Sequence, residues 1–183
     1  MSATNRGSAR RKNDAYYTPE SATLAIMPHL PRCTTVLDPF CGDGYMLKPF
    51  YDIGISVSGL DIDSDSVAVS NARMPNGKFK AVDTLSPGWI MDAELVVTNP
   101  PYSLAMESVV RCLRFTHFGG TAAFLLRLSW LASKKRKQFH ADHPCDAFVL
   151  SARPSFTGDG KTDAADYAWF VYGPGRGERY KVL

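Results

Sequence analysis

The sequence predicts an α/β fold built on a doubly wound, mainly parallel sheet of seven strands. Short β-prone runs alternate with helical segments along the chain, and glycine-bearing or acidic turns follow the first strands. Of the 183 residues, 45% are hydrophobic, which suits one compact core. We therefore expect a single domain over residues 15–183, preceded by a flexible basic leader at residues 1–14.

Each expected strand is a short run rich in β-branched or aromatic residues and bounded by turn residues. The seven strands are expected at 34–38, 56–61, 79–82, 94–98, 122–128, 147–150 and 167–172. Helical segments are expected at 45–53, at 65–72, from residue 103 onward, and at 133–141. A first helix follows Thr18, whose hydroxyl is a candidate cap, and Pro28 should keep that helix short.

Composition excludes several classes of protein. There are 21 Lys and Arg against 18 Asp and Glu, and this small positive balance permits a polyanionic partner without demanding one. The four cysteines form no Cys-x-x-Cys pair, so neither a metal site nor a disulfide framework is predicted. No apolar stretch approaches the roughly 20 residues of a membrane span. We expect a soluble protein in a reducing cytoplasm.

A glycine-bearing turn, Asp38-Pro39-Phe40-Cys41-Gly42-Asp43-Gly44, joins the first strand to its helix. Doubly wound sheets bind ligands beyond the carboxyl ends of their strands, and glycine lets a ligand approach the backbone. The turn lacks the third glycine of the dinucleotide fingerprint, and no Gly-Lys-Ser or Gly-Lys-Thr follows it. The expected ligand is therefore not held by its phosphates. An ordinary strand-to-helix turn remains an alternative for these residues alone.

Acidic residues end the next two strands. Asp61 follows the glycine turn by about 20 residues, where a carboxylate can accept hydrogen bonds from both hydroxyls of a ribose. Asp83 ends the third strand and could accept a hydrogen bond from an adenine amino group. Either aspartate alone could be a helix cap or a turn residue. Together with the glycine turn they indicate a site shaped for a nucleoside.

The tetrapeptide Asn99-Pro100-Pro101-Tyr102 follows the fourth strand and carries the strongest chemical signal. An exocyclic amine on a heteroaromatic ring is a poor nucleophile, because its lone pair is delocalised into the ring. The Asn99 side-chain oxygen and the Pro100 carbonyl could accept the two amino hydrogens and direct that lone pair toward a methyl donor. The prolines stiffen these acceptors, and Tyr102 offers an aromatic face for a base swung out of its stack.

With these segments in this order, the chain resembles class I S-adenosylmethionine-dependent methyltransferases that act on amino groups. It is most similar to the small N6-adenine DNA methyltransferases of phages and prophages, in the gamma arrangement. The resemblance starts at Tyr16-Tyr17-Thr18-Pro19 and covers roughly the first half of the chain. It implies a Rossmann-like methyltransferase fold in one catalytic domain, S-adenosylmethionine as cofactor, and methylation of double-stranded DNA with the target adenine flipped out. It also implies a bacterial host cytoplasm as the location.

The resemblance assigns roles residue by residue. Cofactor binding falls to Tyr17, Thr18, Asp38, Phe40, Gly42, Gly44, Asp61, Ile62 and Asp83. The catalytic residues would be Asn99, Pro100, Pro101 and Tyr102. Larger members carry a separate target-recognition domain for which this chain has no room, so a short or relaxed recognition sequence is expected.

Basic residues in the second half are candidates for nucleic-acid contact. Lys134, Lys135, Arg136 and Lys137 follow Trp130-Leu131 and could bind phosphates, although a solvated helix face explains them nearly as well. Arg153 opens a long polar loop that reaches Asp166, which suggests a functional loop near the target base.

Three other functions compete with DNA methylation. Protein glutamine N5-methyltransferases use the same tetrapeptide, because a carboxamide nitrogen poses the same lone-pair problem, but they usually carry a helical substrate domain before the cofactor turn. Only 37 residues precede Asp38 here, so this function ranks second, beside RNA adenine N6-methylation. A catalytically silent nucleic-acid-binding relative is disfavoured by the intact tetrapeptide.

Overall fold

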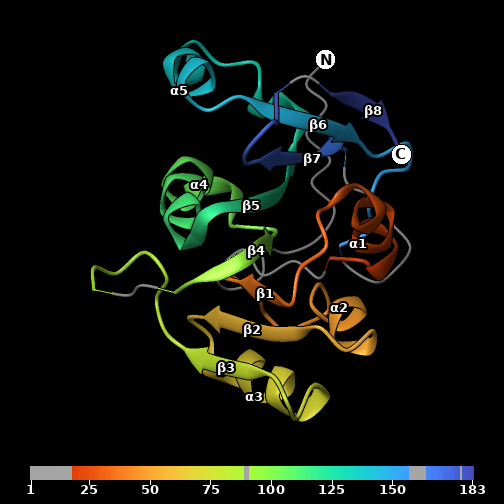
Figure 1. The fold of residues 1–183 in the computed structure, drawn as a ribbon, viewed down its shortest axis with the longest axis vertical. Coiled ribbons are helices and arrows are strands. Elements are labelled where there is room, and N and C mark those ends of the chain that lie inside the picture. The colour runs from red at the N-terminus through yellow and green to blue at the C-terminus, as the bar shows by residue number, and fades with distance from the viewer. Residues whose placement is uncertain (1–17, 89–90, 157–163, 178) are drawn as a thin grey trace, which may run out of the picture.

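A computed structural model describes residues 18–88, 91–156, 164–177 and 179–183, so the leader at 1–14 and Tyr17 lie outside the described residues. Its centre is an eight-stranded sheet with the order β3-β2-β1-β4-β5-β7-β6-β8 (Figure 1). The strands are β1 (Thr35–Asp38), β2 (Ser56–Asp61), β3 (Lys78–Ala81), β4 (Ala93–Thr98), β5 (Thr116–Arg127), β6 (Cys145–Val149), β7 (Tyr167–Tyr172) and β8 (Tyr180–Val182).

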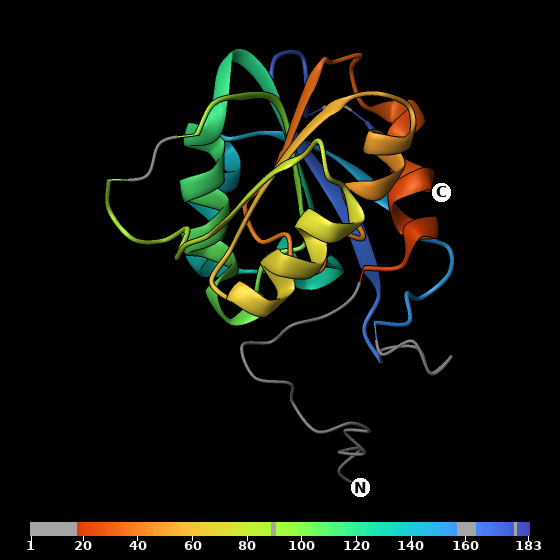
Figure 2. The same cartoon turned by 90° about the horizontal axis from the view of Figure 1, so that it is seen from below.

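The helices lie between these strands and cover both faces of the sheet (Figures 1 and 2). The α-helices are α1 (Glu20–Ile26), α2 (Lys48–Asp52), α3 (Ser64–Arg73), α4 (Ala105–Cys112) and α5 (Lys137–Asp142). Short 3-10 turns are η2 (Met27–His29), η3 (Tyr102–Leu104), η4 (Leu113–Phe115), η5 (Leu128–Trp130) and η6 (Lys134–Arg136). Within the described ranges, no helix combines the length and apolar character that crossing a membrane requires.

The sheet is mainly parallel, as the alternation of strands and helices predicts. Among the strands described, β7 alone runs antiparallel to its neighbours β5 and β6. Side chains alternate across the sheet with period two: Leu95 and Val97 of β4 belong to one apolar core, and Val96 belongs to the other. The first core is covered by α1, α2 and α3, and the second by α4 and α5. The doubly wound architecture is confirmed.

The prediction of seven strands was wrong by one, because β8 was missed. Its three residues pair with β6 in parallel, with Tyr180 opposite Ala147, and all three are exposed. An edge strand without a buried face leaves no alternating pattern for sequence analysis to detect. The basic segment also differs from the single helix expected, because the 3-10 turn η6 precedes a short α5.

Thr18 does not cap the first helix. Pro19 occupies the cap position without a side-chain hydrogen bond, and the Thr18 hydroxyl instead accepts one from the Asn99 side chain. The helix is short, as Pro28 predicts, and continues as η2. The indole nitrogen of Trp169 in β7 donates to the Ala22 carbonyl at 2.9 Å, which fixes α1 against the sheet.

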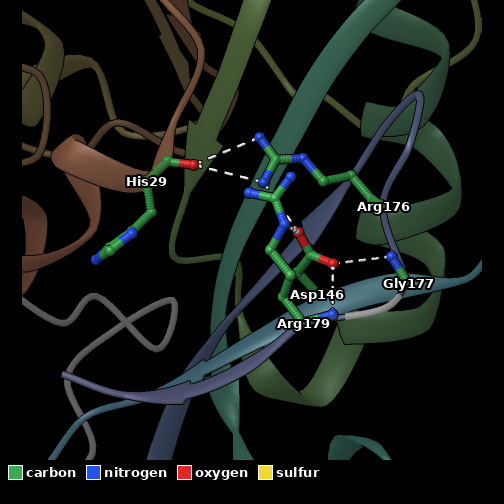
Figure 3. A network of polar contacts seen from close by, with 5 residues as sticks. All are labelled: His29, Asp146, Arg176, Gly177 and Arg179. Atoms are coloured by element: carbon green, nitrogen blue, oxygen red, sulfur yellow. Dashed lines mark hydrogen bonds and ion pairs between the residues drawn. The ribbon is translucent and has the colours of Figure 1, made fainter.

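The buried carboxylate of Asp146 lies at the centre of a polar network that joins η2 to the segment before β8 (Figure 3). Asp146 on β6 accepts from the Arg176 guanidinium at 2.9 Å and from the backbone N–H groups of Gly177 and Arg179. Burial by itself would raise the pKa of Asp146, but these donors outweigh it and the pKa is lowered. Arg176 also donates to the His29 carbonyl in η2, so the segment before β8 is fastened to the segment after α1.

Candidate active site

A cavity of about 370 Å³ lies at the carboxyl ends of β1, β2 and β4. It brings together seven residues that the sequence assigned to cofactor binding: Thr18, Asp38, Phe40, Gly42, Asp61, Ile62 and Asp83. Asn99 and Pro101 of the tetrapeptide also line it, whereas Gly44, Pro100 and Tyr102 do not. The elements that build this cavity are far apart in sequence, and the parallel sheet places their ends along one edge.

Asp38 fixes the turn after β1. Its Oδ1 accepts hydrogen bonds from the Phe40 backbone N–H at 3.0 Å and from the Thr98 hydroxyl at 2.6 Å. The carboxyl group is buried, and burial raises its pKa to about 7 despite these two donors. Asp38 therefore links the glycine turn to the end of β4, directly before Asn99.

The glycines have separate tasks in this turn. Gly44 has a φ of +78°, a backbone conformation that residues other than glycine rarely adopt, and a Cβ there would also lie 2.9 Å from the Ser70 Oγ atom of α3. Gly42 has a φ of +49°, and a Cβ there would meet nothing within 4 Å, which leaves open space on the cavity side. The Ser70 hydroxyl of α3 donates to the Gly42 carbonyl at 2.7 Å and holds the turn in place.

Asp61 connects β2 to the same turn. Its Oδ2 accepts from the Gly42 backbone N–H at 2.8 Å, and its Oδ1 accepts from the Asp63 N–H at 2.9 Å. Each carboxylate oxygen keeps a second lone pair, so both can still accept from a ligand. Burial raises the pKa of Asp61, although these backbone donors oppose the shift. The next side chain, Ile62, is 62% exposed at the cavity and offers an apolar surface to a flat ring.

The turn after β3 forms the wall beside Ile62. Asp83 is exposed at the cavity, and its carboxylate accepts from the Leu85 N–H at 2.9 Å and the Ser86 hydroxyl at 3.0 Å. The buried Thr84 hydroxyl donates to the Pro39 carbonyl, which joins this turn to the glycine turn.

Sequence reasoning missed Arg111 of α4, which supports this wall from behind. Its Nε donates to the Thr84 carbonyl at 3.2 Å and its Nη2 donates to the Ser86 carbonyl at 3.1 Å. An arginine near the end of an amphipathic helix normally indicates a solvated position. No local pattern could therefore have identified this contact, which spans about 25 residues of chain.

Asn99 presents a buried acceptor at the cavity. Its Nδ2 donates to the Thr18 hydroxyl at 3.0 Å, which orients the side chain. Its Oδ1 is buried and has no hydrogen-bond partner among the described residues. An unsatisfied buried acceptor costs about 1–3 kcal/mol, so folded proteins seldom keep one. At this position the oxygen is available to a ligand donor.

Tyr102 lies in an aromatic cluster beside the cavity. Its ring centroid is 5.6 Å from that of Tyr167 and 6.5 Å from that of Phe156, and the Arg127 guanidinium lies 5.2 Å from it. Burial and the neighbouring Tyr167 raise the pKa of Tyr102 well above its usual value. The expected stacking of a base on Tyr102 stays a prediction, because the ring does not line the cavity described here.

The basic residues divide into two kinds. Lys134, Lys135 and Lys137 are exposed. The Arg136 guanidinium instead donates to the Ser129 and Trp130 carbonyls and stacks on the Trp130 ring at 4.6 Å. Contact between these four residues and nucleic acid stays a prediction.

Arg153, expected to bind nucleic acid, forms an ion pair with Asp166 across 2.8 Å. Residues 157–163 of the loop between them lie outside the described residues. Phosphate binding by Arg153 therefore also stays a prediction.

Comparison with known proteins gives a consistent result at the level of the fold. No protein-family model and no curated protein sequence matches the chain. Among solved structures, a putative RNA methyltransferase from Pyrococcus horikoshii superposes with a TM-score of 0.72 at 12% identity, over 91% of each chain. The chain has a Rossmann-like methyltransferase fold.

Two further neighbours share this methyltransferase fold. A TehB-like SAM-dependent methyltransferase from Corynebacterium glutamicum has a TM-score of 0.60 at 16% identity, covering 84% of this chain and 86% of its own. The N-methyltransferase NodS from Bradyrhizobium japonicum, in complex with S-adenosyl-L-homocysteine, has a TM-score of 0.64 at 11% identity over 85% of each chain. At these identities the likeness establishes the fold alone.

Proposed function

We propose that this protein transfers the methyl group of S-adenosylmethionine to the exocyclic N6 amino group of adenine in DNA. The observation that carries the proposal is the Asn99 Oδ1 atom at the cavity, which is buried and has no hydrogen-bond partner within the described part of the chain. Its position directly after β4 is where the sequence predicts an acceptor for an amino group. The methyltransferase fold of the solved neighbours supports a methyl donor in the same cavity.

The lining of the cavity supports one proposed orientation of S-adenosylmethionine. Asp61 would accept from the ribose hydroxyls with its remaining lone pairs, and Ile62 would pack on the adenine ring. Asp83 would accept from the adenine amino group, and the open space beside Gly42 would admit the methionine part. The bound cofactor supplies an electrophilic methyl group.

The chain's contribution to the chemistry is to orient the target amine. Accepting one amino hydrogen at Asn99 Oδ1 and the other at the Pro100 carbonyl favours a pyramidal nitrogen whose lone pair is no longer shared with the ring. Thr18 holds the Asn99 amide in the orientation that this requires. Because the Asn99 side chain is oriented before a substrate arrives, its oxygen would reduce the cost of reaching the transition state.

The exposed lysines after β5 are suited to the phosphates of a nucleic acid, and DNA is proposed over RNA because the order of the motifs resembles that of N6-adenine DNA methyltransferases. Lys134, Lys135 and Lys137 carry positive charge to the surface, and such contacts supply affinity that does not depend on sequence. Because phosphate contacts carry no sequence information, the proposed methylation occurs at adenines in a short or relaxed context.

Methyl transfer from isotopically labelled S-adenosylmethionine tests the proposal directly. Unmethylated DNA, structured RNA and a release-factor protein are offered in parallel, and digestion of the product identifies the modified base or residue. We expect N6-methyladenine in DNA. Label in RNA alone or in a glutamine side chain would replace the proposed substrate, and absence of label in all three with intact cofactor binding would indicate a silent relative.

A further inference from the structure

The hydrogen bond between Thr18 and Asn99 can run in either of two directions. In the structure, Asn99 Nδ2 donates to the Thr18 hydroxyl oxygen at 3.0 Å. A hydroxyl group also carries a donor, and the Asn99 amide turned over by half a rotation would accept that proton with its oxygen. The first direction leaves Asn99 Oδ1 for a ligand donor, whereas the second would place the NH2 group there.

The proton of the Thr18 hydroxyl has no acceptor among the described residues. Thr18 is buried and lines the cavity, as Asn99 does. Within the described part of the chain, the hydroxyl group takes part only in the hydrogen bond from Asn99. A buried hydroxyl proton is seldom left without an acceptor in a folded protein. It is therefore available to a ligand in the cavity or to a reversed Asn99 amide.

The charges around the cavity indicate which part of the methyl donor would take this proton. No lysine, arginine or histidine of the described residues lines the cavity, and its acidic lining residues are Asp38, Asp43, Asp61, Asp63 and Asp83. This lining suits the sulfonium and the ammonium group of S-adenosylmethionine, but it offers no cation to the carboxylate. That carboxylate needs neutral donors, and the hydroxyl of Thr18 can be one of them.

From this geometry we propose that Thr18 donates its hydroxyl proton to the carboxylate of bound S-adenosylmethionine and thereby fixes the direction of its hydrogen bond with Asn99. A hydroxyl whose proton has been taken by one acceptor can only accept from its other partner. Asn99 must then present Nδ2 to Thr18 and Oδ1 to the target amine. The inference rests on the proposed function and adds a coupling between the methyl donor and the target base.

The coupling follows from competition between the two directions of the hydrogen bond. With no other acceptor for the Thr18 proton, the reversed amide would turn its NH2 group toward the incoming amine, so that two donors face each other. Only the fraction of molecules with the first direction could then hold the amine, which weakens the apparent binding of the target. Donation from Thr18 to the methyl donor removes the competing direction, so each ligand should bind more tightly in the presence of the other.

Binding of DNA with and without an unreactive cofactor tests this coupling. The probe is a short duplex that the wild type methylates, so a failure of the proposed function appears at this first step, as absence of methylation, and would overturn the inference as well. The dissociation constant of the duplex is measured by fluorescence anisotropy alone, with S-adenosylhomocysteine, and with the analogue of S-adenosylhomocysteine that lacks the carboxylate. A second duplex carries purine, which has no amino group, in place of the target adenine.

Three variants separate the Thr18 hydroxyl from general effects on the protein. Thr18→Val removes the hydroxyl at nearly constant shape, and Thr18→Ser retains it. Thr84→Val is the matched control, because Thr84 lines the same cavity but its hydroxyl donates to the Pro39 carbonyl. Calorimetry confirms that each protein is folded and saturated with the cofactor analogue.

We expect S-adenosylhomocysteine to tighten wild-type binding of the adenine duplex by roughly fivefold or more. The analogue without the carboxylate should give little of this gain, and so should the purine duplex. Thr18→Val should lose the gain, whereas Thr18→Ser and Thr84→Val keep it. A full gain in Thr18→Val, or no gain in the wild type, would overturn the inference.

Discussion

The two ends of the cavity differ in how completely their polar groups are satisfied. At the proposed cofactor end, both oxygens of Asp61 and both oxygens of Asp83 already accept hydrogen bonds from the chain. At the proposed target end, Asn99 Oδ1 is buried without a partner among the described residues. The carboxylates at the proposed cofactor end are therefore oriented by hydrogen bonds from nearby residues of the chain. The amide oxygen at the proposed target end is available to accept a hydrogen bond from a ligand.

This difference follows from what each end has to do. A cofactor pocket gains affinity when its carboxylates are oriented before the ligand arrives. A catalytic acceptor lowers the barrier only if its interaction strengthens in the transition state, so leaving it unpaired in the resting protein avoids competition. We therefore expect substitutions at the proposed target end to lower turnover and substitutions at the proposed cofactor end to weaken cofactor binding.

The largest effect is expected at Asn99. Asn99→Ala should lower kcat by about 10²–10³-fold, the range typical for loss of one preorganised group in a transition state. Cofactor affinity should change little, whereas loss of the hydrogen bond from Asn99 Nδ2 to the buried Thr18 hydroxyl should lower stability by about 1 kcal/mol. Turnover is measured with labelled cofactor and affinity by calorimetry. Near-normal turnover in the folded variant would contradict the role proposed for Asn99.

The next largest effect is expected at Asp61. Here, in contrast to Asn99, substitution should mainly weaken cofactor binding. Asp61→Ala removes a charged acceptor worth about 1.5–3 kcal/mol, so the dissociation constant for S-adenosylmethionine should rise roughly 10- to 100-fold. Asp61→Asn, which retains one acceptor oxygen, should lose less. Unchanged affinity in a folded Asp61→Ala protein would remove Asp61 from the cofactor site.

Asp38 lies at the boundary between the two ends, and its pKa makes stability depend on pH. The folded value of about 7 lies above the unfolded value of about 3.8, so the protonated carboxyl favours folding and this contribution is lost as pH rises. Between pH 5 and pH 7 the loss amounts to about 2 kcal/mol. Asp38→Asn should flatten this slope in denaturant unfolding, whereas the exposed control Asp142→Asn should keep it. If the unfolding free energy of Asp38→Asn fell as steeply between pH 5 and pH 7 as that of the wild type, Asp38 would not be the source of this pH dependence.

A smaller effect is expected at Arg111, which supports the proposed adenine end of the cavity and does not itself line the cavity. Arg111→Met removes two hydrogen bonds to the turn that follows Asp83, so cofactor affinity should fall about 3- to 10-fold. In the same variant, the preference for S-adenosylmethionine over an analogue with inosine in place of adenosine should also decrease. A variant that loses affinity for both equally would show that Arg111 acts only through general stability.

Sequence reasoning located the parts of the site that lie at strand ends. The positions of Asp61 and Asn99 follow from local β-prone runs, and the parallel topology then places those ends together. It could not find contacts that side chains make across the fold. Arg127 over Tyr102 and the Thr18 hydroxyl beneath Asn99 depend on packing that no local periodicity records.

The hydrogen bonds that fasten α1 have a consequence for the order in which the protein assembles. The Trp169 indole reaches Ala22, and Arg176 reaches His29, so each contact spans 147 residues of chain. Contacts between residues so distant in sequence close late and slow folding. During synthesis, the first helix cannot form its hydrogen bond with Trp169 until β7 has left the ribosome. Because Thr18 immediately precedes that helix, the orientation of Asn99 would be among the last features of the molecule to form.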